Sequence, residues 1–394
     1  VLNPDGTLNT ANSVSFTAWT PMGSQNLPYT GTFNGDNHTI SGLYFNDSSS
    51  DYVGLFGYNN GSIENVGIIE SYFNGKDYVG SVCGYNIVEW FISVKGNTEA
   101  SVANCYNTGT VSGNNYVGGV CGKNYARLSS SAKITTASVI ITRCHNEGSV
   151  SGAGNVGGVC GENSAAAGSS GKISSADIQY CYNIGIVSGT ETVGGVCGNN
   201  YAQATGGIST ESIEYCHNTN AVISSGSVVG GVCGVNNSSS SSEGTANAKI
   251  NRCYYNSDKY SGTAVSNNNC TNTEGRTTAQ FKSGEVAYLL QQGEPFSKWG
   301  QTIGTDDYPV IGGAKVYYYI NCTGEMVYSN QDGTADHSYI NGNCIVCGAY
   351  QLQLQPAPKN GDVYEISNAG QLYWFGALVN GKLTDGRSDD RGAS

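Results

Sequence analysis

The amino-acid sequence predicts a right-handed parallel β-helix, a solenoid in which every coil adds one strand to each of several parallel sheets. Three observations indicate this fold. Two short motifs alternate along the chain at a nearly constant interval, glycine makes up 56 of 394 residues, and only 12% of the residues are charged. Soluble domains usually carry about 25% charged residues and about 7% glycine. The composition therefore favours a turn-rich fold that depends on backbone pairing.

The first motif is Val-Gly-Gly-Val-Cys-Gly or a close variant, and its five copies follow one another at intervals of 38, 39, 37 and 36 residues. The second motif, Cys-Tyr-Asn or Cys-His-Asn, alternates with the first. The copies begin at Val79, Val117, Val156, Val193 and Val229 for the first motif, and at Cys105, Cys144, Cys181, Cys216 and Cys253 for the second. This alternation predicts one coil for each repeat.

Each repeat contains three short alternating segments that read as strands, for example Ile63–Val66, Gly109–Val111 and Val117–Val120. Glycine, asparagine and serine separate them and supply turn geometry. Stacked repeats would form three parallel sheets around one core. The asparagines of the second motif would then lie in a column, where their amides bond to one another at the strand spacing of about 4.8 Å. We expect them to support the stack and not to catalyse a reaction.

Five longer segments interrupt the repeats at the same point of the coil, so we expect them to emerge on one side of the solenoid. We interpret them as variable surface loops. The alternative is a lateral contact face, because the first segment contains the apolar run Ile87–Val94. The five segments are residues 87–100, 125–137, 164–176, 201–211 and 237–248.

The amino-acid sequences of these motifs resemble those of the Glug-motif repeat proteins. The resemblance covers residues 15–260 and is carried by Thr17–Gly23, Tyr29–Tyr44 and Gly54–Gly57, together with the two repeated motifs. It implies a bacterial protein that is secreted or held at the cell surface, with an adhesin-like role, a β-solenoid fold and no catalytic residue. Some Glug segments accompany metallopeptidase domains, but this chain has no His-Glu-x-x-His motif.

The 14 cysteines suggest an oxidising compartment. In the first repeat, Phe56 and Val66 stand where later repeats carry a cysteine of each motif, so the two cysteines are missing together. We therefore predict disulfide-linked rungs in which each first-motif cysteine pairs with the next second-motif cysteine. The alternative is a ladder of buried thiols. The predicted pairs are Cys83–Cys105, Cys121–Cys144, Cys160–Cys181, Cys197–Cys216 and Cys233–Cys253.

The composition changes after residue 270, and we expect a solenoid over 1–270 followed by a small α+β region. Residues 271–320 predict a helix, near 277–290, and strands that cover the open end of the solenoid. Residues 321–360 form a Cys/His module. Its cysteines form disulfides together with Cys270, or its four ligand-type side chains bind zinc. No other cofactor is expected. The four side chains are Cys322, His337, Cys344 and Cys347.

Residues 361–394 predict a strand, a capping box from Asn368 to Gln371 and an amphipathic helix. This segment resembles the one that opens a Glug domain, whereas Val1–Phe16 enters the first coil without a cap. We therefore predict that it complements the N-terminal end of the next subunit in a head-to-tail filament. A covalent tandem array and a return onto the same subunit are the alternatives. The expected contact residues are Ile366, Leu372, Trp374, Phe375, Leu378 and Val379.

The net charge of −12 and the scattered basic residues argue against nucleic-acid binding, and no apolar run reaches the ~18 residues of a membrane-spanning helix. We expect a non-catalytic extracellular structural or adhesive protein whose partners are copies of itself and a host or matrix glycan or protein. The alternative is a carbohydrate-binding or polysaccharide-degrading β-helix. The aligned positions after each Cys-Gly hold no recurring acidic pair, which argues against an enzyme. These positions are Tyr85, Lys123, Glu162, Asn199 and Val235.

Overall fold

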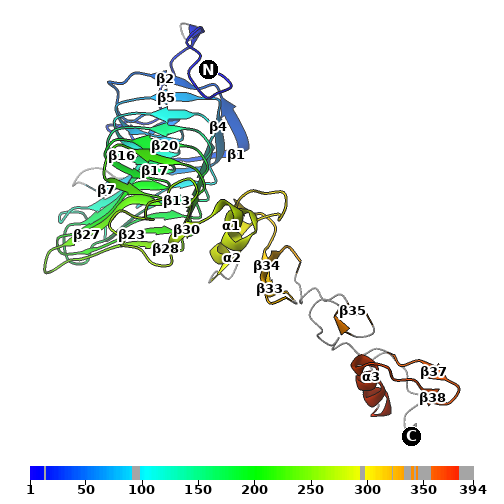
Figure 1. Ribbon diagram of the computed structural model, residues 1–394. Coiled ribbons are helices and arrows are strands. Elements are labelled where there is room, and N and C mark those ends of the chain that lie inside the picture. Colours follow the sequence, from blue (N-terminus) through cyan, green and yellow to red (C-terminus); the bar gives the residue numbers. More distant parts are fainter. Residues whose placement is uncertain are drawn as a thin grey trace. The chain divides into compact units, whose positions relative to one another are not determined.

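The computed structural model describes residues 1–12, 15–90, 98–292, 298–321, 323–331, 339–340, 343–344 and 356–380. The chain forms two compact units, Val1–Gly313 and Ala314–Ser394. The first unit is a parallel β-solenoid, in which β16 (Asn155–Gly157) and β17 (Cys160–Ala167) belong to one coil and β20 (Val187–Gly189) belongs to the next (Figure 1). The fold class predicted from the repeats is confirmed.

Four parallel sheets build the solenoid, one more than the three predicted. From β7 onward, each strand of sheet 1 begins at the cysteine of a first motif. Sheet 2 contains the most strands. Sheet 1 contains β3 (Phe56–Asn59), β7 (Cys83–Trp90), β12 (Cys121–Leu128), β17, β22 (Cys197–Ala204) and β27 (Cys233–Ser240). Sheet 2 contains β1 (Thr32–Ser41), β4 (Ser62–Ile69), β8 (Glu99–Ala103), β9 (Tyr106–Asn107), β13 (Thr136–Thr142), β14 (His145–Asn146), β18 (Ile173–Gln179), β19 (Tyr182–Asn183), β23 (Ile208–Glu214), β24 (His217–Asn218), β28 (Thr245–Asn251), β29 (Tyr254–Asn256) and β30 (Glu274–Arg276).

Two shorter sheets complete each coil. They correspond to the two strands predicted after each second motif, so the additional sheet is sheet 1, whose strands reach into the segments expected to be loops. Sheet 3 contains β2 (Tyr44–Asn46), β5 (Tyr72–Asn74), β10 (Thr110–Ser112), β15 (Val150–Ser151), β20 and β25 (Val222–Ser224). Sheet 4 contains β6 (Asp77–Val79), β11 (Asn115–Gly118), β16, β21 (Thr192–Gly194) and β26 (Val228–Gly230).

The inside of the coils is one apolar core of valine, isoleucine, leucine, phenylalanine and cysteine side chains, most of them fully buried. The residue before each second-motif cysteine, such as Asn104 or Arg143, adopts a left-handed backbone with φ of 51° or 55°. This corner lets the chain leave one strand of sheet 2 and enter the next, as between β13 and β14. Left-handed geometry is uncommon for residues other than glycine, asparagine and aspartate.

Strands extend from both sides into the segments that were expected to be surface loops. In the second of these segments, β12 extends to Leu128 and β13 begins at Thr136, and both continue their sheets in register. Their inward side chains form a second small core, which includes Val88, Ala126 and Ala165. These segments form strands because every second residue is small and apolar and packs between the extensions of sheets 1 and 2. Ile87 and Val88 of the apolar first segment are buried and do not form an exposed face.

The N-terminal end of the solenoid is covered, contrary to the expectation of an uncapped first coil. Trp19, Met22 and Tyr29 pack against the core, and Phe33 also contacts it. The backbone amide of Trp19 donates to the carbonyl of Tyr44 in β2. The segment from Trp19 to Phe33 therefore caps the first full coil of the same chain.

The helical region after the solenoid packs on its side. Helices α1 (Thr278–Lys282) and α2 (Glu285–Gln291) are separated at Gly284, whose φ of 90° ends the single helix that we predicted. With β31 (Trp299–Gly300) and β32 (Val310–Ile311), they lie against Tyr182 and Tyr254 of sheet 2 (Figure 1). These elements therefore cover the outer face of sheet 2, whereas the expectation was a cover over the end of the solenoid.

The second unit contains short antiparallel hairpins and one helix. The paired strands are β33 (Tyr317–Ile320) with β34 (Met326–Ser329), β35 (Tyr339–Ile340) with β36 (Asn343–Cys344), and β37 (Lys359–Asn360) with β38 (Val363–Tyr364). Helix α3 (Ala369–Val379) begins at Asn368, whose side chain accepts from the amide of Gln371 at 2.9 Å. The predicted N-cap is confirmed, but the Gln371 side chain accepts from the amide of Ser367 and not from that of Asn368.

Candidate functional site

The asparagine column predicted from the second motif is present. The amide of Asn107 donates to Asn146, Asn146 to Asn183 and Asn183 to Asn218, each at 2.8 Å. The column ends there because Tyr255, not Asn256, is in register with Asn218. These fully buried amides are engaged by their neighbours, in agreement with a role in stacking.

The same column explains the paired glycines of the first motif. A Cβ atom on Gly158 would overlap the side chain of Asn183, and one on Gly195 would overlap Asn218. Gly119, Gly158 and Gly195 therefore leave room for the asparagine that follows in the chain, whereas Gly231 faces the ring of Tyr255. The two motifs are complementary halves of one packing arrangement.

The cysteines form two ladders of free thiols. Cys121 is in register with Cys83 and Cys160, and the amide of Cys105 donates to the sulfur of Cys144 at 3.4 Å. All ten motif cysteines are fully buried and free, so the five predicted disulfides are not formed in the structure. Because equal positions of successive coils stack, each sulfur meets its equivalent in the next coil. Burial raises the pKa of Cys160 and Cys216 well above the ordinary thiol value.

The richest polar surface in the solenoid is the outer face of sheet 1, which we call the sheet 1 face. Side chains on alternate positions of each strand point outward and form three columns across the coils. The columns are Tyr58, Tyr85, Lys123, Glu162 and Asn199; Ile87, Tyr125, Ser164 and Tyr201; and Glu89, Arg127, Ala166 and Gln203.

At the centre of this face, Lys123 and Glu162 form an ion pair. The Nζ atom lies 2.8 Å from Oε1, and the two side chains are only 13% and 10% exposed. Glu162 also accepts from Asn155 at 2.8 Å, from Asn199 at 3.1 Å and from Ser164 at 3.0 Å. The carboxylate is therefore fully hydrogen-bonded, which is the condition for holding a charge away from water.

Tyrosine rings surround the ion pair. The ammonium of Lys123 lies 4.8 Å from the ring centroid of Tyr116 and 4.6 Å from that of Tyr125. Tyr78 stacks on Tyr116 with centroids 4.9 Å apart, and burial raises the pKa of Tyr78 to about 12. The phenol of Tyr78 thus stays protonated at neutral pH.

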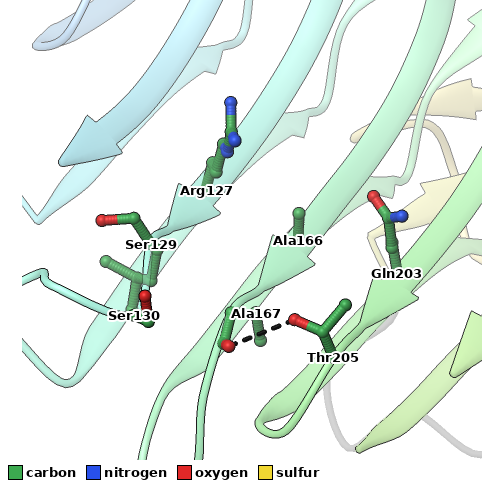
Figure 2. Close-up of a pocket in the computed structure, with 9 residues that line it drawn as sticks. Arg127, Ser129, Ser130, Ala166, Ala167, Gln203 and Thr205 are labelled. Carbon is green, nitrogen blue, oxygen red and sulfur yellow. Dashed lines mark hydrogen bonds between the residues drawn. The ribbon is translucent and has the colours of Figure 1, made fainter. Parts of the chain in front are cut away.

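A hollow of about 330 Å³ lies at the far edge of the sheet 1 face. Figure 2 shows Arg127 on β12, Ala166 on β17 and Gln203 on β22, with Ala166 between the two polar side chains. The guanidinium of Arg127 is 3.2 Å from the carboxylate of Glu89, whose pKa is raised by burial and lowered less by Arg127. Ser129, Ser130 and Thr205 add hydroxyl groups, and Thr205 donates to the carbonyl of Gly168. The volume of this hollow is at the lower end of the range for small-ligand sites.

The predicted contact residues of the C-terminal segment separate into two groups. Trp374 and Leu378 are 3% and 2% exposed, because they pack against Ala357 within their own unit. Ile366 is 40% exposed and Leu372 is 58% exposed. Trp374 is buried because Tyr364 of the hairpin β37–β38 packs on it, with ring centroids 5.8 Å apart. Phe375 and Val379 are half-buried.

The zinc or disulfide prediction at 321–360 cannot be compared with atomic positions. Cys322, His337 and Cys347 lie outside the described residues, as does the side chain of Cys344. Cys270 belongs to the first unit and is half-buried against the end of the solenoid core.

The motif alignment predicts only the first outward column of the sheet 1 face. The columns at Tyr125 and Arg127 fall in the segments that we expected to be loops. Period-two alternation after each Cys-Gly, as in Lys123, Tyr125 and Arg127, was the available signal. In the described part of the chain, no helix has the length and apolar character of a membrane-spanning segment.

These observations define a β-solenoid repeat protein with a polar, aromatic outer face. Comparison with known protein families finds no match, and neither does comparison with curated protein sequences. Among solved structures, the chain is similar to a protein of Bacteroides ovatus described as a putative immunoglobulin A1 protease. The match has a TM-score of 0.52 and 23% sequence identity, and it covers 75% of this chain and 82% of that one. At this identity the likeness concerns the fold alone.

Proposed function

We propose that this protein is a non-catalytic structural or adhesive repeat protein of the Glug type, located outside the bacterial cell, whose copies assemble through residues 361–394. The observation that carries this proposal is that four apolar side chains within residues 363–373 of the second unit are exposed. Val363 and Tyr373 are each 65% exposed, Leu372 is 58% exposed and Ile366 is 40% exposed. Exposed apolar patches of this kind mark protein contact sites.

The solenoid suits the role of a rigid spacer. Its coils are joined by parallel strands and by asparagine columns that run from coil to coil, such as Asn124 to Asn163 to Asn200 at 2.8 Å each. Such columns stabilise stacked strands because every amide bonds above and below. Free thiols also agree with an extracellular location, since buried thiols are inert to oxidants in solution.

The experiment compares the full chain with a variant that carries Leu372→Ser and Tyr373→Ser. Both positions are exposed, so the fold of α3 is expected to remain. Light scattering after size exclusion and electron microscopy should show oligomers or filaments for the full chain and monomers for the variant. A matched control, Ile208→Ser, changes a 44% exposed side chain on sheet 2 and should assemble normally. A monomeric full chain, or an assembling double variant, would contradict the proposal.

A second function, glycan binding, is favoured by the sheet 1 face. Its hollow combines a guanidinium, an amide and hydroxyl groups around the small side chain of Ala166. The planar guanidinium of Arg127 and the amide of Gln203 can hydrogen-bond to neighbouring hydroxyls of a neutral sugar, and the small Ala166 side chain leaves space for the sugar ring. The non-catalytic proposal is tested on the same samples by incubation with polysaccharides and with immunoglobulin A1, the protein named in the description of the similar structure. Cleavage of either would contradict it.

A further inference from the structure

The C-terminal end of the solenoid is covered unevenly. Residues after β29 continue sheet 1, where Val265 pairs with Cys233, and sheet 2, where Thr271 pairs with Asn251. The carbonyl of Thr263 accepts from Gly231 beside sheet 4. Sheet 3 ends at β25, and the described part of the chain places no further strand on it. Sheet 4 likewise ends at β26 but has the Gly231 hydrogen bond beside it, whereas β25 has no backbone hydrogen bond to later residues in the described part of the chain.

The hydrogen-bond pattern of sheet 3 shows what this edge lacks. In successive coils the amide of Val150 donates to the carbonyl of Ile186 in the next coil, and Val187 donates to Ala221, at 2.9 Å and 3.1 Å. Val222 is in register with Val187, and Ser224 with Gly189. The amides of Val222 and Ser224 therefore face the side on which a seventh strand would lie, and its carbonyl groups would be their acceptors.

A groove of about 460 Å³ adjoins this edge. Val222, Val229 and Tyr260 contribute its apolar lining, and serine, threonine and glycine residues complete it. The hydroxyl of Tyr260 donates to the carbonyl of Val229 at 3.1 Å, which fixes the ring beside the groove. The inward positions along sheet 3 are apolar, as in Phe73, Val111 and Val222. An added strand would have to present a similar side chain.

The two ends of the solenoid differ in how their edges are protected. At the N-terminal end, β1 carries Asp36 and His38 and has a bulge between Asn34 and His38, and β2 is bonded by Trp19. Charges, bulges and covering segments are the usual devices that prevent strand addition. The segment Ala221–Ser225 has no charge and no proline. The unprotected edge is thus β25, and not the N-terminal end that the sequence suggested.

We propose that the open edge of β25 is the acceptor for the C-terminal unit of a second copy, which adds residues 362–367 as a seventh strand of sheet 3. This inference rests on the proposed function and names its acceptor. Val363 is 65% exposed in the two-stranded sheet β37–β38. A strand that adds to a sheet edge gains main-chain hydrogen bonds, and its side chain selects the pocket. Donor and acceptor are different surfaces, so repeated contacts are heterologous and extend into a polymer.

The first test blocks the edge in the full chain. Ser224→Pro removes one amide that faces the missing strand, and Ser225→Pro serves as a matched control because the Ser225 amide already donates to Gly189 within the solenoid. Thermal unfolding reports whether each variant folds. Folded Ser224→Pro should assemble at least 10-fold less at equal concentration, whereas Ser225→Pro, if folded, should assemble like the parent chain. Normal assembly of folded Ser224→Pro would overturn the acceptor assignment and leave the proposed function standing.

The second test does not depend on the stability of a proline variant. A photo-reactive amino acid replaces Ile223, which is 55% exposed and points away from the core, and a mixture of isotopically light and heavy copies is irradiated. Cross-links from position 223 to residues 362–367 of the other isotopic form are expected. The same probe at Ile208 should not give them. Cross-links within one copy, or to another region, would overturn the inference, and a monomeric parent chain would overturn it together with the proposed function.

Discussion

The Nζ atom of Lys123 lies 2.8 Å from the carboxylate of Glu162, on adjacent strands of the outer face of sheet 1. Although both residues point away from the core, their side chains are only 13% and 10% exposed. The tyrosine rings at positions 116 and 125 flank the ammonium group. An outward position is thus not the same as an exposed one, and the ion pair behaves energetically as an interior feature.

Removal of one partner of this pair should destabilise the protein strongly. Lys123→Met leaves the Glu162 carboxylate shielded from water without its cation, and we expect a loss of about 3 kcal/mol in the free energy of unfolding. The double variant Lys123→Met with Glu162→Gln should recover most of this loss, because no unpaired charge remains. Denaturant unfolding measures both. Equal losses in the single and double variants would show that side-chain packing, and not charge, holds this site.

Substitution in the asparagine column Asn124–Asn163–Asn200 should lower the free energy of unfolding more than substitution of an asparagine at the surface. Asn163 accepts from Asn124 and donates to Asn200, both at 2.8 Å, and it is fully buried. Asn163→Ala leaves polar groups on both neighbours unpaired, which predicts a loss of about 2 to 4 kcal/mol. The exposed Asn247 provides the control, for which Asn247→Ala should change the free energy of unfolding by less than about 0.5 kcal/mol. Similar values for both variants would contradict the prediction.

The buried carboxyl of Glu211 should make stability fall as the pH rises. Burial raises its pKa to about 9, and its hydrogen-bond donor is Ser209 at 2.8 Å. Between the ordinary glutamate pKa of 4.5 and about 9, the unfolded chain loses the proton while the folded chain keeps it, so the unfolded state is favoured by up to about 1.4 kcal/mol per pH unit.

The variant Glu211→Gln cannot lose a proton there. Its free energy of unfolding, relative to that of the parent chain, should therefore increase from pH 5 to pH 8. Denaturant unfolding at several pH values provides the measurement. A difference between the two proteins that stays constant over this range would show that Glu211 titrates normally in the folded state.

The two thiol ladders predict a specific alkylation result. All ten motif cysteines should react with iodoacetamide when the protein is unfolded without reductant, and hardly at all in the folded state, since they are fully buried. Peptide mass spectrometry identifies each modified residue. Recovery of unmodified, linked peptides that contain Cys83 and Cys105 would instead support the disulfide rungs suggested by the first repeat.

Glycan binding, if it occurs on the sheet 1 face, should depend on the hollow at its edge. Arg127→Ala with Gln203→Ala removes the two polar side chains on either side of Ala166 and should weaken binding to an array of neutral polysaccharides at least 10-fold. Ile208→Ala on sheet 2 should not. Calorimetric titration with the best array ligand quantifies the effect. Unchanged affinity in the double variant would exclude this face.

The repeats made the architecture predictable, but not the number of sheets or the path of the longer segments. Valine and cysteine at fixed intervals specify the inward positions, and the predicted asparagine column follows from equal residues at equal positions. The segments around Arg127 were misread as loops because serine, alanine and glycine are weak strand formers. In the solenoid they become strands, since each pairs with a neighbouring coil that is already in place.

By itself, the sequence determined the parallel solenoid, the coil register and the residues that stack, because identical motifs can satisfy their backbone and amide groups only by repeating one another. The tertiary structure alone decided which groups meet across different parts of the chain. It placed α1 and α2 on the side of sheet 2, covered the first coil with Trp19, paired Lys123 with Glu162 and left β25 as an open edge. Contacts of this kind depend on where non-repeating residues lie once the coils are stacked. The repeat pattern does not specify the distances between such residues in space.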